Sequence, residues 1–371
     1  MAQIINRLNF ADFNNNLTVA WTKSYSDFPK RASVMYNMSS TDVDTGDISG
    51  LDGFSMAKIK LEGEEMAFGS LTQNYRKTWS TYEIALETKI TWNMRKYSKY
   101  DLIQKAINNL AQSAAKRMEL DLTHRFTFAN SISYTTQEGI SKTTTVGDGL
   151  ALLSTVHTMP GTSTTFRNRV ANNPVLSKGG LEAAETLFAT QMIDTNGETT
   201  FQDPTHLVIT NDPNQKNTAM QYLKSYADPT ASQAGVMNPY EGKYGLIILP
   251  YLSTTAAGIY DSTKAKYWFL VNMNHKDAYC KVGQDPMFIT PVDNGGKEFE
   301  TLDWKYATLS SFALEIVDAR WIVKKLPAIL KSSLIDSNIH QLFLVNGLLD
   351  NEAEGESHRE RLTEKTLEKV M

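Results

Sequence analysis

The sequence is poor in the residues from which metal and redox centres are built. Its 371 residues include one cysteine, Cys280, so neither an intrachain disulfide nor a cysteine-based zinc site can form. The six histidines lie far apart, and none has the His-x-x-x-His or Glu-x-x-His spacing of a helical metal site. We therefore expect no metal and no cofactor.

Phosphate-binding loops and long apolar runs are also missing. Neither Gly-x-x-x-x-Gly-Lys-Ser/Thr nor Gly-x-Gly-x-x-Gly after a strand occurs, so nucleotide chemistry has no support. No window approaches the ~18 uninterrupted apolar residues of a membrane span, and Met1 to Ala20 contain no long apolar run. We expect no membrane segment, no signal peptide and synthesis in the cytosol.

No excess of either charge is present. The chain has 37 Lys and Arg against 41 Asp and Glu, a net charge of −4, whereas a dedicated nucleic-acid binder usually has a basic excess or stripe. A protein that encloses nucleic acid without binding it tightly would have nearly equal numbers of acidic and basic residues, and so would many enzymes. The aromatic content of 10% suits large packed surfaces, and the length suggests about two domains.

One group of residues could form a catalytic triad. Asp148, Ser154 and His157 could act as orienting acid, nucleophile and base. Their spacing does not match the Gly-x-Ser-x-Gly elbow of serine hydrolases. A histidine that is hydrogen-bonded within a loop is the simpler interpretation, and we predict that the chain is not an enzyme. A cytosolic hydrolase using Ser154 and His157 is kept as an alternative.

The first fifty residues are polar, and we predict that they are irregular. They include the runs Asn14-Asn15-Asn16 and Ser39-Ser40-Thr41-Asp42. Ordering such a stretch costs conformational entropy unless contacts from outside offset it. A disordered tail and an arm that orders against a neighbouring subunit both fit this pattern.

The pattern of residues 53–92 predicts a two-stranded ribbon with a charged tip. Residues 54–61 alternate at a period of about two, and a return strand runs from Tyr75 to Trp92. Such a ribbon is only marginally stable alone, so we expect it to lie on a partner. Its acidic tip could be a solvated turn, an ion site or a contact with basic residues of another subunit. The residues concerned are Glu62, Glu64 and Glu65 at the tip, and Arg167, Arg169, Lys324 and Lys325 as candidate basic partners.

Beyond the ribbon, apolar residues at every fourth position from Leu102 to Phe126 predict a helix of about thirty residues that ends at Asn130 and is on the order of 45 Å long. A mixed α/β segment follows over about 180–275, and long strands that return beside the helix come after it. The charged end, 351–371, could be a surface helix or a flexible tail. The further predicted elements are helices at 181–192 and 215–226, and strands at 206–210, 244–249, 267–273, 299–306 and 310–324.

Several motifs, in this order, resemble those of the major capsid proteins of tailed phages, and among them the Mu-like major head subunit (gpT-like) proteins. The likeness covers roughly residues 50–325, so 328–371 extends past the usual end of the family. The segments that carry it are Lys77-Thr78-Trp79-Ser80-Thr81-Tyr82, Lys89 to Arg95, Leu110 to Ala115, Asp148 to His157, and Phe312 to Arg320 with its Asp-x-Arg finish.

This resemblance implies an α+β fold of the HK97 capsid type, with an N-terminal arm, an extended β-hairpin loop, a long spine helix, and peripheral and axial domains. The implied divisions are an arm at 1–52, the extended loop at 53–92, a peripheral domain with the spine helix at 93–180 and 275–327, an axial domain at 181–274, and a C-terminal extension at 328–371.

The implied function is that of a major capsid (head) protein. It would be made in the host cytoplasm and self-assemble into hexamers and pentamers of an icosahedral shell that encloses double-stranded phage DNA. Its expected partners are its own copies, a scaffolding protein, a portal and a possible decoration protein. An encapsulin-like nanocompartment shell is the alternative on the same fold. The expected inter-subunit contacts are Glu62, Glu64, Glu65, Phe68, Arg76, Trp79, Tyr82, Arg167 and Arg169.

Overall fold

The computed structural model describes residues 7–69, 72–97, 99–170, 175–229, 235–291 and 303–325. The chain divides into two compact units, Met1–Pro327 and Ala328–Met371, and the described residues all belong to the first. The predictions for 293–296, for the start of the strand at 299–306 and for 328–371 therefore fall partly or wholly outside the described residues. Among those residues, no helix is both long and apolar enough to cross a membrane.

One long helix, α3 (Tyr100–Thr127), runs along the body of the unit, as the sequence predicted. Its first half buries one apolar stripe that includes Ile103, Ile107 and Ala111, whereas nearly all of its last turns are buried. The helix ends before the predicted Asn130, because the Phe128 N–H already closes the last turn on the His124 carbonyl (3.0 Å). A short helix, α2 (Trp92–Lys96), precedes it and is capped by the Thr91 side chain.

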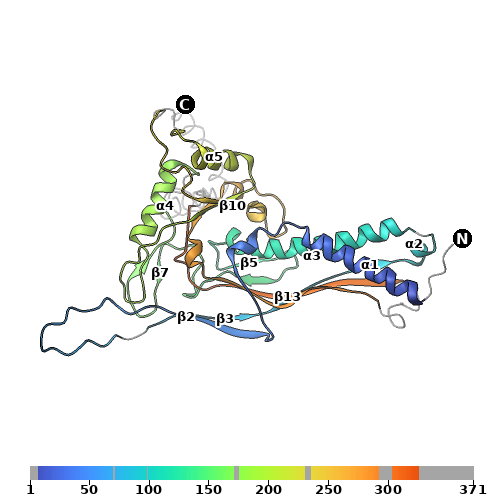
Figure 1. Cartoon of the computed structure of the whole chain (residues 1–371), viewed down its shortest axis with the longest axis horizontal. Coiled ribbons are helices and arrows are strands. Elements are labelled where there is room, and N and C mark those ends of the chain that lie inside the picture. Colours follow the sequence, from blue (N-terminus) through green and yellow to red (C-terminus); the bar gives the residue numbers. More distant parts are fainter. Residues whose placement is uncertain are drawn as a thin grey trace, which may run out of the picture. The chain divides into compact units, whose positions relative to one another are not determined.

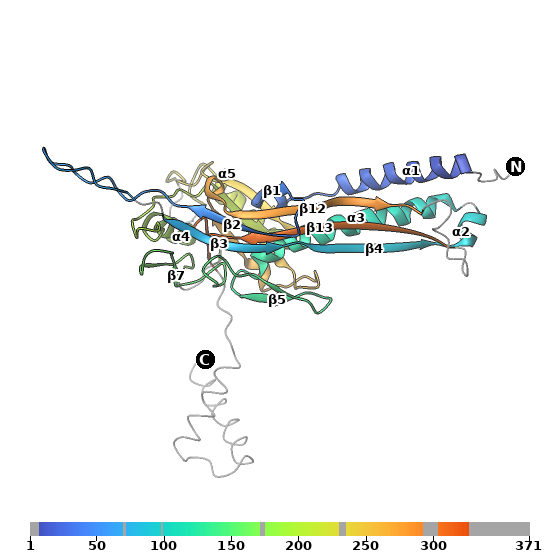
Figure 2. The same cartoon turned by 90° about the horizontal axis from the view of Figure 1, so that it is seen from below.

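A four-stranded sheet lies against α3 (Figure 2). Its order is β1 (Asn37–Ser40), β12 (Ala278–Ile289), β13 (Trp304–Ile316) and β4 (Tyr82–Ile90); β1 is parallel to β12 and the other pairs are antiparallel. The predicted boundary between a strand at 299–306 and a strand at 310–324 is wrong. Residues 304–316 form one strand, and the turn at Asp318–Arg320 separates it from β14 (Ile322–Lys325).

A second sheet and two helices form the mixed segment, in agreement with the sequence. The sheet order is β10 (Gly245–Leu249), β9 (His206–Thr210), β11 (Trp268–Val271) and β14, so its last strand comes from residues 322–325. The helices are α4 (Lys178–Thr190) and α5 (Pro213–Lys224). Asp212 caps α5 by accepting from the Asn214 and Gln215 N–H groups, and the proline at the first position has no N–H to satisfy.

The prediction that the first fifty residues are irregular is wrong. They form α1 (Arg7–Ser26) and the strands β1 and β2 (Thr45–Leu51), and α1 packs on α3 of the same chain (Figure 1). Leu17 and Trp21 are buried against Ile103 and Ile107 of α3. Even Asn14 is buried, and its side chain accepts a hydrogen bond from the Tyr306 hydroxyl (3.0 Å). Apolar residues four positions apart therefore determine the structure of this segment, despite its polar composition.

The ribbon also differs from its prediction. β2 pairs antiparallel with β3 (Gln73–Ser80), whereas 53–69 forms no strand, so the strand predicted at 54–61 is wrong. The predicted return strand is two strands in different sheets, because β3 ends at Ser80 and β4 then pairs with β13. The remaining elements are short: β5 (Ser133–Thr135), β6 (Ser141–Thr143), β7 (His157–Thr158), β8 (Thr165–Phe166), and the 3-10 helices η1 (Ala32–Met35), η3 (Pro250–Ser253), η4 (Lys264–Lys266) and η5 (Met273–His275).

Candidate functional site

The segment that joins β2 to β3 carries a series of exposed apolar side chains. Their exposed fractions range from 59% for Phe54 to 104% for Phe68, with Ile59 at 92%. Several exposed apolar side chains within one short segment of a folded protein indicate a contact with another molecule. The members of this series are Phe54, Met56, Ile59, Leu61, Met66 and Phe68.

The root of this segment, where it leaves β2, is held by a buried ion-pair cluster centred on Arg320. The two terminal nitrogens of Arg320 contact the two carboxylate oxygens of Asp52 (3.2 Å each), and its Nε donates to Asp318 (2.6 Å). Only 9–13% of each of these three side chains is exposed. Burial alone would lower the pKa of Arg320, but Asp318 and Asp52 outweigh burial and raise this pKa above its ordinary value.

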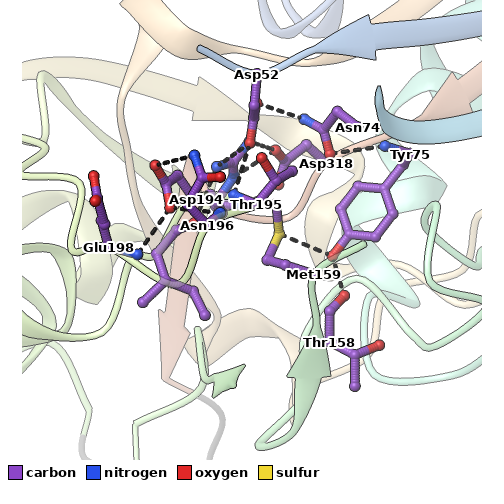
Figure 3. Close-up of polar contacts among 12 residues, drawn as sticks. Asp52, Asn74, Tyr75, Thr158, Met159, Asp194, Thr195, Asn196, Glu198 and Asp318 are labelled. Atoms are coloured by element: carbon purple, nitrogen blue, oxygen red, sulfur yellow. Dashed lines mark hydrogen bonds and ion pairs between the residues drawn. The ribbon is translucent and has the colours of Figure 1, made fainter. Parts of the chain in front are cut away.

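Asp52 joins further segments to the same cluster (Figure 3). It accepts hydrogen bonds from the Thr195 N–H (3.2 Å) and from the Asn74 side chain (3.0 Å), so the turn after α4 and the start of β3 meet at one carboxylate. Asp194 shapes that turn, because its carboxylate accepts from two N–H groups of the turn, including that of Glu198 (2.8 Å). The outgoing limb of the segment is thereby fixed to the body at Asp52.

The returning limb is fixed at Tyr75, which is buried. Its hydroxyl donates to the Thr158 carbonyl and lies 3.1 Å from the sulfur of Met159. Burial, reinforced by Asp318, raises the pKa of Tyr75 well above its ordinary value, so the hydroxyl stays a donor. A side chain at Gly147 would lie only 2.3 Å from Tyr75 Cβ, so only glycine fits beside this ring.

A second buried charged cluster fixes α3 to the strands beside it. The Tyr82 hydroxyl donates to Asp121 on α3 (3.0 Å), and the Lys142 ammonium lies over the Tyr82 ring, 3.0 Å from its centroid. Burial lowers the pKa of Lys142 to about 8, although Asp121 opposes this shift.

On the neighbouring face, Glu315 of β13 pairs with Lys77 of β3 (2.7 Å) and with Arg125 of α3. The ribbon, the sheet and the long helix are thus connected by charge as well as by packing.

The predicted contact residues fall into two groups. Glu62, Glu65 and Phe68 are exposed on the 53–69 segment, and Glu64 also lies there but accepts the Leu61 N–H (3.3 Å). The others are distributed over the body. Arg76 pairs with Asp47 in the ribbon, and Trp79 is buried against Gly46. Tyr82 contacts Asp121 of α3. Arg167 is exposed after β8, and Arg169 is half-buried and forms a backbone β-bridge with Lys324.

The suspected triad is not assembled for catalysis. His157 is fully buried and its Nδ1 lies 2.6 Å from Asp148, but Ser154 Oγ accepts the Val156 N–H (3.1 Å). Within the described ranges, His157 Nε2 has no hydrogen-bond partner, so no contact joins the base to the serine. The simpler interpretation, a hydrogen-bonded histidine, is confirmed, but His157 lies in the short strand β7 and not in a loop. The described residues also contain no group of three His, Cys, Asp or Glu side chains that could hold a metal.

A protein-family model described as "Phage capsid protein" matches residues 75–324, which is more than half of the chain. The chain belongs to the phage capsid protein family. As a capsid protein it is a structural component of the virion, and the family match favours this function over the encapsulin-like alternative. The match includes most of β3, all of α3, the strands of both sheets except β1, and the Asp318–Arg320 turn.

Among solved structures, the capsid protein is similar at low identity to "Gordonia phage Cozz" (11% identity, TM-score 0.48, 81% of this chain and 87% of that one). It is also similar to "Capsid of Ralstonia phage GP4" (12%, 0.47, 80% and 88%). A third is the virus-like particle from Pyrococcus furiosus (10%, 0.43, 84% and 98%). The sequence matches none of the curated proteins.

Sequence reasoning missed the Arg320 cluster. The Asp318-x-Arg320 motif was visible, but Asp52 lies far away in the sequence, and nothing local to either segment indicates the pairing.

Proposed function

We propose that this capsid protein is the major head subunit of a tailed phage, with an HK97-type fold and a place among the gpT-like proteins. Its copies form hexamers and pentamers that close an icosahedral shell around double-stranded DNA. The family match over 75–324 supports the capsid function, and the order of ribbon, long helix, mixed segment and returning strands supports the fold.

In the proposed division, the extended loop is 53–92 and the axial domain is 181–274, to which β14 contributes a strand. The arm is 1–52, the peripheral domain is 93–180 with 275–327, and the extension is 328–371. The subunit is made in the host cytoplasm and catalyses no reaction. Besides its own copies, its proposed partners are a scaffolding protein, a portal and a possible decoration protein.

The observation that carries the proposal is the contrast between an exposed segment and its buried root. Burying a side chain such as Ile59 or Phe68 stabilises a complex by about 1.5–3 kcal/mol, and both are almost fully exposed in the single chain. The Arg320–Asp52 pair holds the segment at a fixed point of departure. A fixed root makes an exposed apolar segment suitable for one defined contact on a neighbouring subunit. The acidic tip and Phe68 would take part in it, with Arg167 or Arg169 as basic partners.

The test compares the wild-type chain with an Ile59→Ser/Phe68→Ser variant, each co-expressed with the scaffolding protein of the same phage. Negative-stain microscopy should show shells for the wild type and none for the variant, while both give the same thermal unfolding by circular dichroism. The matched control is Ile132→Ser/Ile140→Ser, which removes two apolar side chains of about 60% exposure near the β5–β6 hairpin. Normal shells from the Ile59/Phe68 variant would contradict the proposed contact. A wild-type chain that stays a small monomer at every concentration would contradict the capsid function.

A further inference from the structure

We propose that residues 54–61 of one copy pair as an added strand with the open edge of β4 in a neighbouring copy. This inference rests on the proposed function and names the surface that receives the extended segment. It is a case of β-augmentation, in which an extended segment completes the hydrogen bonding of a sheet edge.

The first observation is the open edge itself. β4 is the last strand of its sheet, and within the described part of the chain it pairs on one side only, with β13, over Tyr82–Phe312 to Ile90–Trp304. A strand at the edge of a sheet presents N–H and C=O groups that can pair with another strand, and folded proteins usually cover or pair them. The proposed pairing uses the stretch from Ile84 to Glu87. The opposite edge differs, because β1 pairs with part of β12 and Trp21 of α1 stacks on Phe288.

The second observation is a segment with the pattern of a strand but without a partner. Residues 54–61 alternate in two halves, with Phe54 and Met56 on one face and Ile59 and Leu61 on the other. They form no strand, and all of them are exposed. Two of their N–H groups are held by carboxylates: Met56 donates to Glu198 and Leu61 to Glu64, both at 3.3 Å in exposed surroundings. Such exposed bonds are readily exchanged for those of a sheet.

The third observation is that the apolar faces of the two strands correspond. On β4, the side chains that face α3 include Ile84, which packs on the core, and Leu86, which is 47% exposed. An antiparallel register that sets Ile59 opposite Leu86 also sets Leu61 opposite Ile84. Directly opposed β-branched and aliphatic side chains stabilise a strand pair. The exposed surface of Ile59, Leu61 and Leu86 would then be covered together.

The fourth observation is charge complementarity on the other face. β4 exposes Glu83 and Glu87 there, and the segment has Lys58 and Lys60 at the alternate positions. In the register above, Lys58 lies opposite Glu87, and Lys60 is diagonal to both glutamates. The pairing ends at Leu61, because Glu62 would otherwise lie directly opposite Glu83. Opposite charges across a strand pair are favourable and like charges are not. Charge and hydrophobicity are therefore both compatible with the antiparallel register over residues 58–61.

The occupant is a second copy and not the same chain. The segment leaves the body at the Gln73 end of β3, whereas β4 follows the Ser80 end. At about 3.3 Å per residue, β3 separates these two points by roughly 25 Å. The buried Arg320–Asp52 pair also holds the root in place, so the segment of one chain does not lie along its own β4.

Charge reversal tests the pairing. Lys58→Glu/Lys60→Glu and Glu83→Lys/Glu87→Lys should each abolish shells under conditions in which the wild type assembles. The four substitutions combined should restore them, because each strand then meets its complement again. Lys58→Arg/Lys60→Arg is the control that keeps charge and should assemble normally. Shells from either reversed variant, or no recovery in the combined one, would overturn the pairing. Absence of shells from the wild type would instead contradict the proposed function.

A cross-link tests the register. Lys58→Cys with Glu87→Cys, oxidised after assembly, should give a ladder of disulfide-linked chains on a non-reducing gel. The native Cys280 is buried, so it does not compete. The control pair, Lys58→Cys with Glu241→Cys, is equally exposed and should give no ladder. A ladder from the control alone, or from neither pair in shells that form normally, would overturn the proposed contact.

Discussion

Arg320 joins segments that are far apart in the sequence, and it is the residue on which the geometry of the loop root depends. It contacts Asp52, which follows β2, and Asp318 in the turn between β13 and β14. It also donates to the carbonyl of Ile193, which follows α4. A short motif such as Asp-x-Arg can be recognised in a sequence, but its distant partner cannot, because the pairing arises only when the strands assemble.

We predict that Arg320→Ala lowers the free energy of unfolding by about 3–5 kcal/mol, since it leaves two buried carboxylates without their cation. The measurement is urea unfolding of the unassembled subunit at neutral pH. Arg76→Ala is the matched control: this pair with Asp47 lies at the surface, with Arg76 67% exposed, and its loss should change stability little. Equal effects of both substitutions would contradict the structural role of Arg320.

His124 predicts a pH dependence of stability. Burial lowers its pKa from 6.5 to about 4, so the unfolded chain binds a proton more readily than the folded one between these values. The resulting stabilisation is fully present above pH 6.5 and is lost as the pH falls towards 4, by on the order of 3 kcal/mol. In urea titrations at pH 7 and pH 4.5, His124→Gln should reduce the difference between the two pH values. His275→Gln, at an exposed position, should leave the difference unchanged. An unchanged difference in the His124 variant would refute this account.

At the scale of elements, periodicity predicted what depends on one chain alone. α3, β9 and the mixed α/β segment follow from regular apolar spacing and were confirmed. Among the elements that were predicted wrongly, two show different physical reasons for the failure. α1 buries apolar residues four positions apart, Leu17 and Trp21, but the run of asparagines before them concealed this pattern. Residues 54–61 have the pattern of a strand, but the described chain offers them no neighbouring strand.

We predict that Trp21→Ala detaches α1 from α3. Trp21 is 4% exposed and stacks on Phe288, and truncating a buried aromatic of this size costs about 3–5 kcal/mol. Hydrogen exchange followed by mass spectrometry should show faster exchange over 7–26 with little change in β9 and β11. Val19→Ala, at a residue that is 69% exposed on the same helix, is the control. Unchanged protection of α1 in the Trp21 variant would show that α1 is held by other contacts.

At the scale of the whole molecule, the sequence predicted the capsid function through a set of motifs in order and not through any site. A shell subunit needs large complementary surfaces in place of a pocket, and the symmetry of the shell repeats each contact many times. Such contacts involve residues that are exposed in the single chain, as Ile59 and Phe68 are, so they cannot be read from a pattern of burial.

Cryo-electron microscopy of particles assembled from this chain with its scaffolding protein tests the central claim most directly. We predict closed icosahedral shells in which residues 53–69 of every copy lie against a neighbouring copy, with Ile59 and Phe68 buried at the contact. Shells in which these residues remain in solvent would contradict the role assigned to the extended segment. Particles that never exceed a single chain would contradict the capsid function itself.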